Sequence, residues 1–271
     1  MEIKEKGKDK ISFNLSPSSL NLYYQSPLLF YLTHIAKVAD DTAVPVCYGL
    51  SGNIVHECLE KYAKKEFDKD GGCIHLINKW ENCCLHKHLD LGGNPLNQID
   101  YLTAMLNGMQ IIDSYETHVC EETIQFPFKE NETMKIGIKG IIDLQATKKD
   151  EDKPVIIDYK TSNNISESKN FERQALFYNL LVYKKKNILP VKTHFHYLKL
   201  GVSKDYLFNL AQIEEFYKEL NSVAEEILFL GEDINNYPVG EIEDVFNSKK
   251  GACLREMERR KRKDNNSCKV F

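Results

Sequence analysis

Long apolar segments are absent from this sequence of 271 residues, although 42% of its side chains are hydrophobic. None of its apolar runs approaches the roughly 20 residues that a membrane-spanning helix requires. The first ten residues, MEIKEKGKDK, lack the apolar stretch of a signal peptide. We therefore expect a cytoplasmic protein that does not interact with a membrane.

Two further features are missing. The net charge is −4, so the chain lacks the general positive charge of a protein that binds polyanions over its whole surface. No G-x-x-x-x-G-K-[ST] loop occurs, which excludes a recognisable ATPase of this type. Any affinity for nucleic acid must therefore come from a local basic surface, and any helicase activity from another chain.

The eight cysteines include no Cys-x-x-Cys pair. Without a secretory signal, they indicate reduced thiols in an intracellular compartment. Residues 73–88 contain three cysteines and three histidines, which raises the hypothesis of a structural zinc. Their spacing matches no standard zinc motif, so we favour ordinary helix residues and leave the zinc open.

The most informative segment is residues 154–161, PVIIDYKT. A β-branched apolar run predicts a buried strand, on which residues two positions apart point to the same face. Asp158 and Lys160 should therefore project side by side. Such charges are costly near a core unless they pair or bind a metal, and a hydrolytic site would use both.

A second acidic strand lies upstream, at residues 134–147. A short charged turn joins it to the first, which predicts a hairpin. The hairpin should bring Asp143 near Asp158, where two carboxylates and a lysine could anchor a hard cation. The alternative is an exposed hairpin whose polar residues only face water.

The remaining pattern predicts an α/β protein with a small mixed sheet flanked by helices. Expected helices are 16–38, 50–66, 74–90, 98–118, 168–187 and 211–230, and expected strands are 122–129, 134–147, 153–160, 192–200 and 204–210. We expect a disordered start at 1–14, a main domain at 15–235 with a helical cap at about 70–118, and a C-terminal extension at 236–271.

Five motifs in order resemble the PD-(D/E)XK nuclease superfamily, and within it the RecB-like and Cas4-like branch. They are LSPSSL with SPLLFYL at 15–32, GNIVHE at 52–57, GIID at 140–143, IDYKT at 157–161 and QALFY at 174–178. The resemblance covers about residues 15–197. It implies a restriction-endonuclease-like core, which is compatible with the small mixed sheet that the strand pattern predicts.

The resemblance also implies roles at the matching positions. Metal ligands would be His56, Asp143, Asp158 and the backbone carbonyl of Tyr159, holding Mg²⁺ or Mn²⁺. Lys160 would orient and polarise the attacking water, by its charge or by proton transfer. Gln174 and Tyr178, which share a helix face, would support the lysine and contact the nucleic-acid strand. Without its motif, His56 would fit a packed core histidine better than a ligand.

Many of these relatives hold an iron–sulfur cluster on four cysteines. Here Ser26 occupies the N-terminal position, and the C-terminal end offers only Cys253 and Cys268. The ligand set is therefore too small, and we expect no cluster.

We expect a metal-dependent deoxyribonuclease, an exonuclease or end processor acting on single-stranded DNA or DNA ends in recombination or repair. Its catalytic residues would be Asp143, Asp158 and Lys160. The alternatives are a non-catalytic nucleic-acid-binding module and a nuclease subunit that works with a separate helicase or recombination protein. The basic tail is either a set of DNA backbone contacts or a solvated run: Arg259, Arg260, Lys261 and Arg262.

Overall fold

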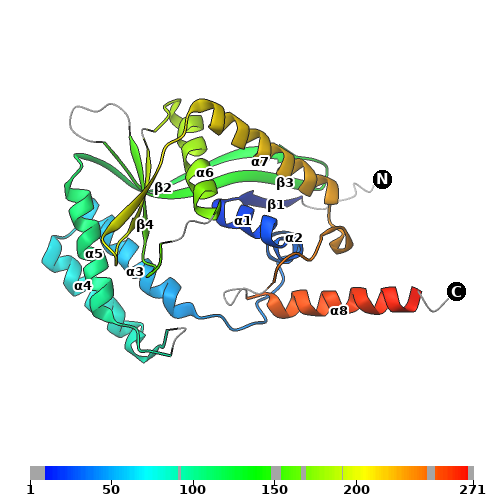
Figure 1. Ribbon diagram of the computed structural model, residues 1–271, viewed down its shortest axis with the longest axis horizontal. Helices are drawn as coiled ribbons and strands as arrows, with labels where there is room; N and C mark the ends of the chain where they lie inside the picture. Colours follow the sequence, from blue (N-terminus) through cyan, green and yellow to red (C-terminus); the bar gives the residue numbers. More distant parts are fainter. Residues whose placement is uncertain are drawn as a thin grey trace, which may run out of the picture. The chain divides into compact units, whose positions relative to one another are not determined.

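The computed structural model describes residues 10–90, 93–147, 154–165, 169–190, 192–242 and 248–267. These residues form a mixed α/β fold (Figure 1). The strands are β1 (Ile11–Leu15), β2 (Thr117–Glu130), β3 (Met134–Thr147), β4 (Val155–Lys160), β5 (Thr193–Tyr197) and β6 (Val202–Tyr206). Their order is β1-β3-β4-β5-β6, and β2 also pairs with β3. The predicted α/β class with a mixed sheet is confirmed.

The sheet is mixed because its strand pairs differ in direction. The pairs β1–β3 and β4–β5 are parallel, whereas β3–β4 and β5–β6 are antiparallel. Helix α6 (Lys169–Lys186) connects the parallel strands β4 and β5, as parallel neighbours require a crossover. The strands expected at 192–200 and 204–210 pair as a hairpin, β5–β6, whose turn includes Gly201 with a φ of +63° that suits glycine.

The chain forms two compact units. Unit 1 contains Met1–Pro45, Gln125–Lys139 and Tyr217–Phe271, and unit 2 contains Val46–Ile124 and Gly140–Phe216. Strands β2 and β3 and helix α7 (Leu210–Leu230) run through both, so no single cut in the sequence separates them. The domain boundaries expected at residues 14 and 235 stay predictions.

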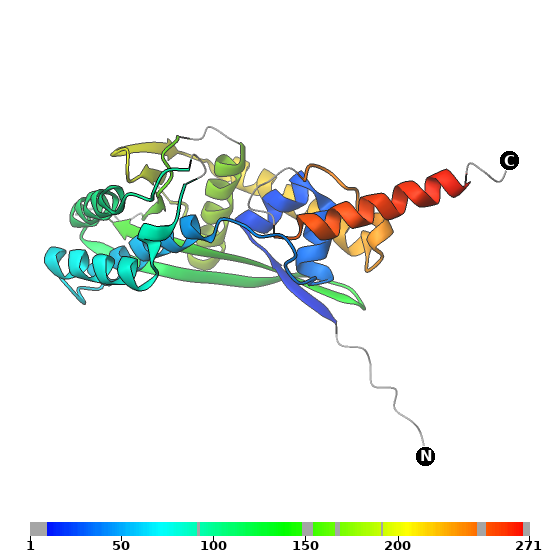
Figure 2. The ribbon, with the colours of Figure 1, turned by 90° about the horizontal axis from the view of Figure 1, so that it is seen from below.

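Unit 2 contains three helices that lie side by side (Figure 2): α3 (Val46–Ala63), α4 (Lys69–Asn82) and α5 (Gln98–Asp113). The sequence predicts all three, but the predicted ends of the last two are wrong. Helix α4 stops at Asn82 because Cys84 takes a left-handed φ of 50°, which a helix cannot continue. Helix α5 stops at Asp113 and leaves Thr117 to begin β2.

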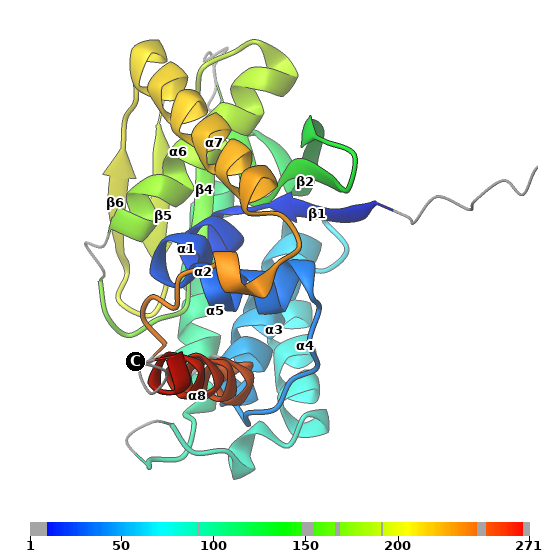
Figure 3. The ribbon, with the colours of Figure 1, turned by 90° about the vertical axis from the view of Figure 1, so that its right-hand side faces the viewer.

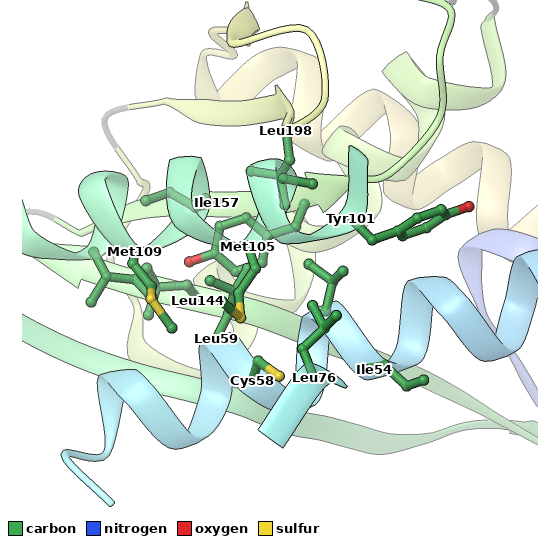
Figure 4. Close-up of a cluster of buried hydrophobic side chains, with 14 of the residues drawn as sticks. Ile54, Cys58, Leu59, Leu76, Tyr101, Met105, Met109, Leu144, Ile157 and Leu198 are labelled. Atoms are coloured by element: carbon green, nitrogen blue, oxygen red, sulfur yellow. The ribbon is translucent and has the colours of Figure 1, made fainter. Parts of the chain in front are cut away.

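The core of unit 2 joins these helices to strands β3 and β4 (Figure 4). Helix α3 buries Ile54, Val55, Cys58 and Leu59, a spacing that places all four on one face. Helix α5 approaches closely at Gly108, where an added Cβ would lie 2.6 Å from the Leu59 side chain. The close approach of α3 therefore depends on glycine at this position.

Strand β4 presents different residues to its two faces. Ile157 and Tyr159 belong to the core that includes α3 and α5. Helix α6 packs on the sheet (Figure 3), where the Asn179 amide on α6 donates to the Thr193 hydroxyl on β5. The alternation leaves Asp158 and Lys160 to point away from Ile157 and Tyr159.

Unit 1 differs from expectation at its start. Ile11–Leu15 form strand β1, which pairs in parallel with Met134–Ile138 of β3, although the sequence predicts disorder there. The pairing was hidden because its two segments are far apart in sequence. The rest of the expected disordered start, residues 1–9, lies outside the described residues.

The helix predicted at 16–38 is interrupted. Helix α1 (Pro17–Gln25) begins at a Ser16 cap, but α2 (Pro27–Phe30) is a separate helix, and a π-helical turn follows at Tyr31–Ile35. Ser26 caps α2, and its hydroxyl donates to the Val239 carbonyl. Pro27 cannot donate a backbone N–H to α1, so the first helix ends before it.

Helix α8 (Lys250–Ser267) carries the basic tail and a buried carboxylate, Glu256. Arg259 and Arg260 both donate to Glu256. Arg260 also donates to the carbonyl oxygens of Ile234 and Tyr237. The two guanidinium groups thus hold the helix to the segment before it.

Replacing Glu256 with Gln is expected to lower the free energy of unfolding by about 1–3 kcal/mol, because charged hydrogen bonds are lost. The hydrogen bonds from Arg259, with those from Arg260, lower the pKa of Glu256 to about 2, from 4.5. Its stabilising effect is therefore complete above pH 4.5 and is lost as the pH falls toward 2. Urea unfolding of both proteins across this range measures the difference.

Glu258→Gln is the matched control, since Glu258 is exposed and lies 3.8 Å from Arg262. It should change the stability by under about 0.5 kcal/mol at any pH. Equal effects of the two substitutions would contradict the structural role of Glu256.

Candidate active site

Strand β4 ends with a buried ion pair. Lys160 Nζ lies 2.6 Å from Asp158 Oδ2, as the same-face alternation predicts. Asp158 is 4% exposed, and its burial raises its pKa despite the neighbouring lysine. The pair lies at the carboxyl end of β4, which ends at Lys160.

Strand β3 places Asp143 beside this pair. Its register with β4 sets Leu144 opposite Ile157, and so Asp143 lies opposite Asp158. The backbone N–H of Tyr159 donates to Asp143 Oδ2 at 2.7 Å. The predicted hairpin and the predicted approach of the two aspartates are confirmed.

Helix α3 brings His56 to the same place. His56 Nε2 lies 3.1 Å from the Tyr159 carbonyl oxygen, and Nδ1 lies 3.4 Å from Asp143 Oδ1. Burial alone would lower the pKa of His56, but the Asp143 carboxylate raises it to about 9. The imidazole is thus held by two acceptors that the sequence motifs supply.

Glycine lets α3 approach the end of β4. A Cβ added to Gly52, one turn before His56, would lie 3.1 Å from the Thr161 hydroxyl oxygen. Because Gly52 has no side chain, α3 can pass close to Thr161, the residue that follows β4.

Glu121 is a site residue that the sequence does not predict. One ligand atom each from His56, Glu121 and Asp143 lie within 4.8 Å of one another. Glu121 lies on β2, and its backbone has a left-handed φ of 49°, which is strained for any residue other than glycine. Burial and the Asp143 charge raise its pKa to about 7. Its only signal in the sequence is the acidic pair Glu121–Glu122 before the predicted strand.

Helix α6 supplies the residues that support the ion pair. Lys160 Nζ donates to Gln174 Oε1 at 3.0 Å, and Gln174 Nε2 donates to Asp158 Oδ1 at 3.0 Å. The same amide nitrogen is 2.8 Å from the Tyr178 hydroxyl oxygen. Gln174 therefore bridges both members of the pair, and Tyr178 extends the network.

These donors fit a hard divalent cation. Glu121, Asp143 and Asp158 contribute three carboxyl groups to this region, and Lys160 pairs with Asp158. Carboxylate and carbonyl oxygens with one imidazole suit Mg²⁺, Mn²⁺ or a similar ion. His56 lies against Glu121 and Asp143 through Nδ1 and against the Tyr159 carbonyl through Nε2, whereas Asp158 lies against Lys160 and Gln174. The role of Asp158 as a ligand stays a prediction.

The other candidate residues lie elsewhere. In unit 1, Arg259 and Arg260 are engaged with Glu256, while Lys261 and Arg262 are exposed. Their contact with DNA stays a prediction.

The cysteine- and histidine-rich segment at 73–88 forms separate local pairs. His75 pairs with Glu57, and His86 pairs with Glu81. Among the described residues, no group of three metal-binding side chains arises from this segment. Cys253 is buried in α8, and Cys268 lies outside the described residues.

No helix in the described part of the chain is both long and apolar enough to cross a membrane.

Three comparisons relate this chain to known proteins. The family profile of the PD-(D/E)XK nuclease superfamily matches residues 14–242. No curated protein matches the chain. A crystal structure of a presumptive exonuclease from Eubacterium rectale aligns with a TM-score of 0.45 and 10% identity, over 85% of this chain and 84% of that one. The chain belongs to the PD-(D/E)XK nuclease superfamily, and this membership implies phosphodiester hydrolysis on a nucleic acid.

Proposed function

We propose that the chain is a divalent-metal-dependent deoxyribonuclease of the RecB-like and Cas4-like branch, acting on single-stranded DNA or DNA ends. The observation that carries the proposal is the convergence of His56, Asp143 and the Tyr159 carbonyl beside Lys160. Three sequence motifs, on α3, β3 and β4, thus meet at one strand end. The exonuclease assignment and the preference for DNA rest on the family resemblance.

His56, Glu121, Asp143 and the Tyr159 carbonyl would hold Mg²⁺ or Mn²⁺, with Asp158 as a further candidate ligand. The cation would supply Lewis-acid stabilisation of the charge that develops on the phosphate. Sequence motifs support this ligand set except for Glu121, which the geometry adds.

Lys160 would act on the attacking water and the phosphate. Its ammonium carries a fixed positive charge at the strand end, and Gln174 and Asp158 orient it. Water attacks phosphorus, and the bond to the leaving oxygen breaks. A positive charge held in place before the reaction stabilises the phosphate oxygens without reorganisation.

The test is cleavage of end-labelled single- and double-stranded DNA with Mg²⁺, Mn²⁺ or EDTA. We expect products with either metal and none with EDTA. Circular single-stranded DNA separates an end processor, which leaves the circle intact, from an endonuclease. An RNA of the same sequence tests the preference for DNA. Absence of cleavage with intact DNA binding would instead favour the binding module or a subunit that needs a helicase.

Replacing Glu121 with Gln is expected to weaken Mn²⁺ binding about tenfold, because a ligand carboxylate loses its charge. Isothermal titration calorimetry of the metal-free protein measures this affinity directly.

Glu122→Gln is the matched control on the adjacent residue. Its carboxylate accepts hydrogen bonds from Lys185 and Gln145 rather than facing His56. The control should bind Mn²⁺ as the unmodified protein does. Equal Mn²⁺ affinities of the two variants would exclude Glu121 from the metal site.

A further inference from the structure

Two phenylalanine rings flank the ammonium of Lys160. Its Nζ lies 4.8 Å from the ring centroid of Phe171 and 4.7 Å from that of Phe195. The two rings stand at 86° to each other with centroids 5.7 Å apart. The ammonium therefore contacts two aromatic rings as well as the polar groups of Asp158 and Gln174.

We propose that Phe171 and Phe195 form an aromatic clamp that positions the charged ammonium of Lys160 for its action on the phosphate. The clamp rests on the proposed function of Lys160. Both phenylalanines act through the lysine, so they are positioning residues.

The fold explains why these rings meet at the lysine. Phe195 is the register partner of Asp158 on the parallel neighbour β5, so it lies beside the strand end. Phe171 lies three residues before Gln174 on α6, and this spacing places both on one helix face. One turn of α6 thus supplies both a hydrogen-bond acceptor and a ring to Lys160.

Aromatic ring faces are better suited to positioning the Lys160 ammonium than a further carboxylate would be. An ammonium has three N–H donors, and Asp158 and Gln174 account for two partners. The negative face of an aromatic ring attracts the cation, more strongly when water is excluded. The Lys160 side chain is only 16% exposed.

Phe195 has a packing role as well, and this decides the choice of variant. It is fully buried with Ala175, Tyr197 and Tyr206, whereas Phe171 is only partly buried at the edge of the same cluster. Substitution of Phe195 would test the core and the clamp together. Phe171 is therefore the position at which the clamp can be tested by itself.

The first measurement replaces Phe171 with mono-, di- and trifluorinated phenylalanine. Fluorine withdraws electron density from the ring face while the ring keeps its shape. We expect kcat for DNA cleavage to fall stepwise, by about three- to tenfold over the series, with KM and Tm unchanged. The matched control is the same series at Phe208, whose ring stacks on Tyr206 and should give a flat response.

The second measurement does not need activity. Nuclear magnetic resonance of protein labelled with ¹³C-lysine should show the ε-methylene signal of Lys160 shifted upfield by the two rings. The Lys160 signal is assigned as the one that is missing from the spectrum of Lys160→Arg. In Phe171→Leu, the chemical shift of this signal should move toward the shifts of exposed lysines. If the protein cleaves no DNA, this signal still decides the clamp. The clamp would be overturned if the Lys160 signal had the chemical shift of exposed lysines. It would also be overturned if kcat did not change on fluorination of Phe171.

Discussion

Lys160→Met is expected to lower the rate of DNA cleavage about 10²- to 10⁴-fold at saturating substrate. Methionine keeps the length of the stem but removes the charge that Asp158 and Gln174 orient. Because the ammonium acts mainly on the transition state, kcat should fall much more than the affinity for DNA changes. Single-turnover cleavage and DNA binding in Ca²⁺ separate these two effects.

The same substitution should also destabilise the fold. Asp158 is buried, so removing its cation leaves an uncompensated charge, at a cost of about 3–5 kcal/mol. The double variant Asp158→Asn with Lys160→Met removes both charges and should recover most of this stability. Recovery of stability without activity would show that lost cleavage does not result from unfolding.

Lys192→Met is the matched control, because it removes the charge of a different lysine, one that lies directly before the neighbouring strand β5. Lys192 pairs with Asp205, away from Asp158. It should retain cleavage within about twofold. The proposed role of Lys160 would be wrong if Lys160→Met kept more than about a tenth of the rate.

Local rules predict much of the site. The alternation of side chains along a strand is enough to pair Asp158 with Lys160. A short charged turn is enough to place Asp143 opposite Asp158, because a hairpin brings neighbouring segments together. Helical spacing likewise places Gln174 near Tyr178. Each of these contacts depends on residues close in sequence.

The family motifs place His56 with Asp143 and Tyr159, but other contacts between separate segments were not predicted. Glu121 reaches His56 only through a left-handed backbone residue, which breaks the alternation that predicts strand faces. Strand β1 needs β3, more than a hundred residues later, before it has a hydrogen-bonding partner. The Phe171 ring finds Lys160 only after α6 packs on the sheet. Such features follow from tertiary packing, which no local pattern contains.

Asp143→Asn should have the largest effect on metal binding. Its carboxylate joins the Tyr159 N–H to the His56 imidazole, and an amide keeps the shape without the charge. We expect Mn²⁺ affinity to fall at least about 100-fold, with loss of cleavage. Calorimetry with Mn²⁺ measures the first effect, and cleavage of end-labelled DNA measures the second.

The metal-free protein gives an independent signature of the same contact. The Asp143 charge raises the pKa of His56 to about 9, against the effect of burial. The asparagine variant should therefore show a lower pKa of His56 in a proton nuclear magnetic resonance titration. Since the raised pKa belongs to the folded state, the contact stabilises the metal-free fold below pH 6.5, and this effect is lost as the pH rises through about 9. An unchanged His56 pKa in the variant would show that Asp143 does not hold the imidazole, and the metal centre would then need another arrangement.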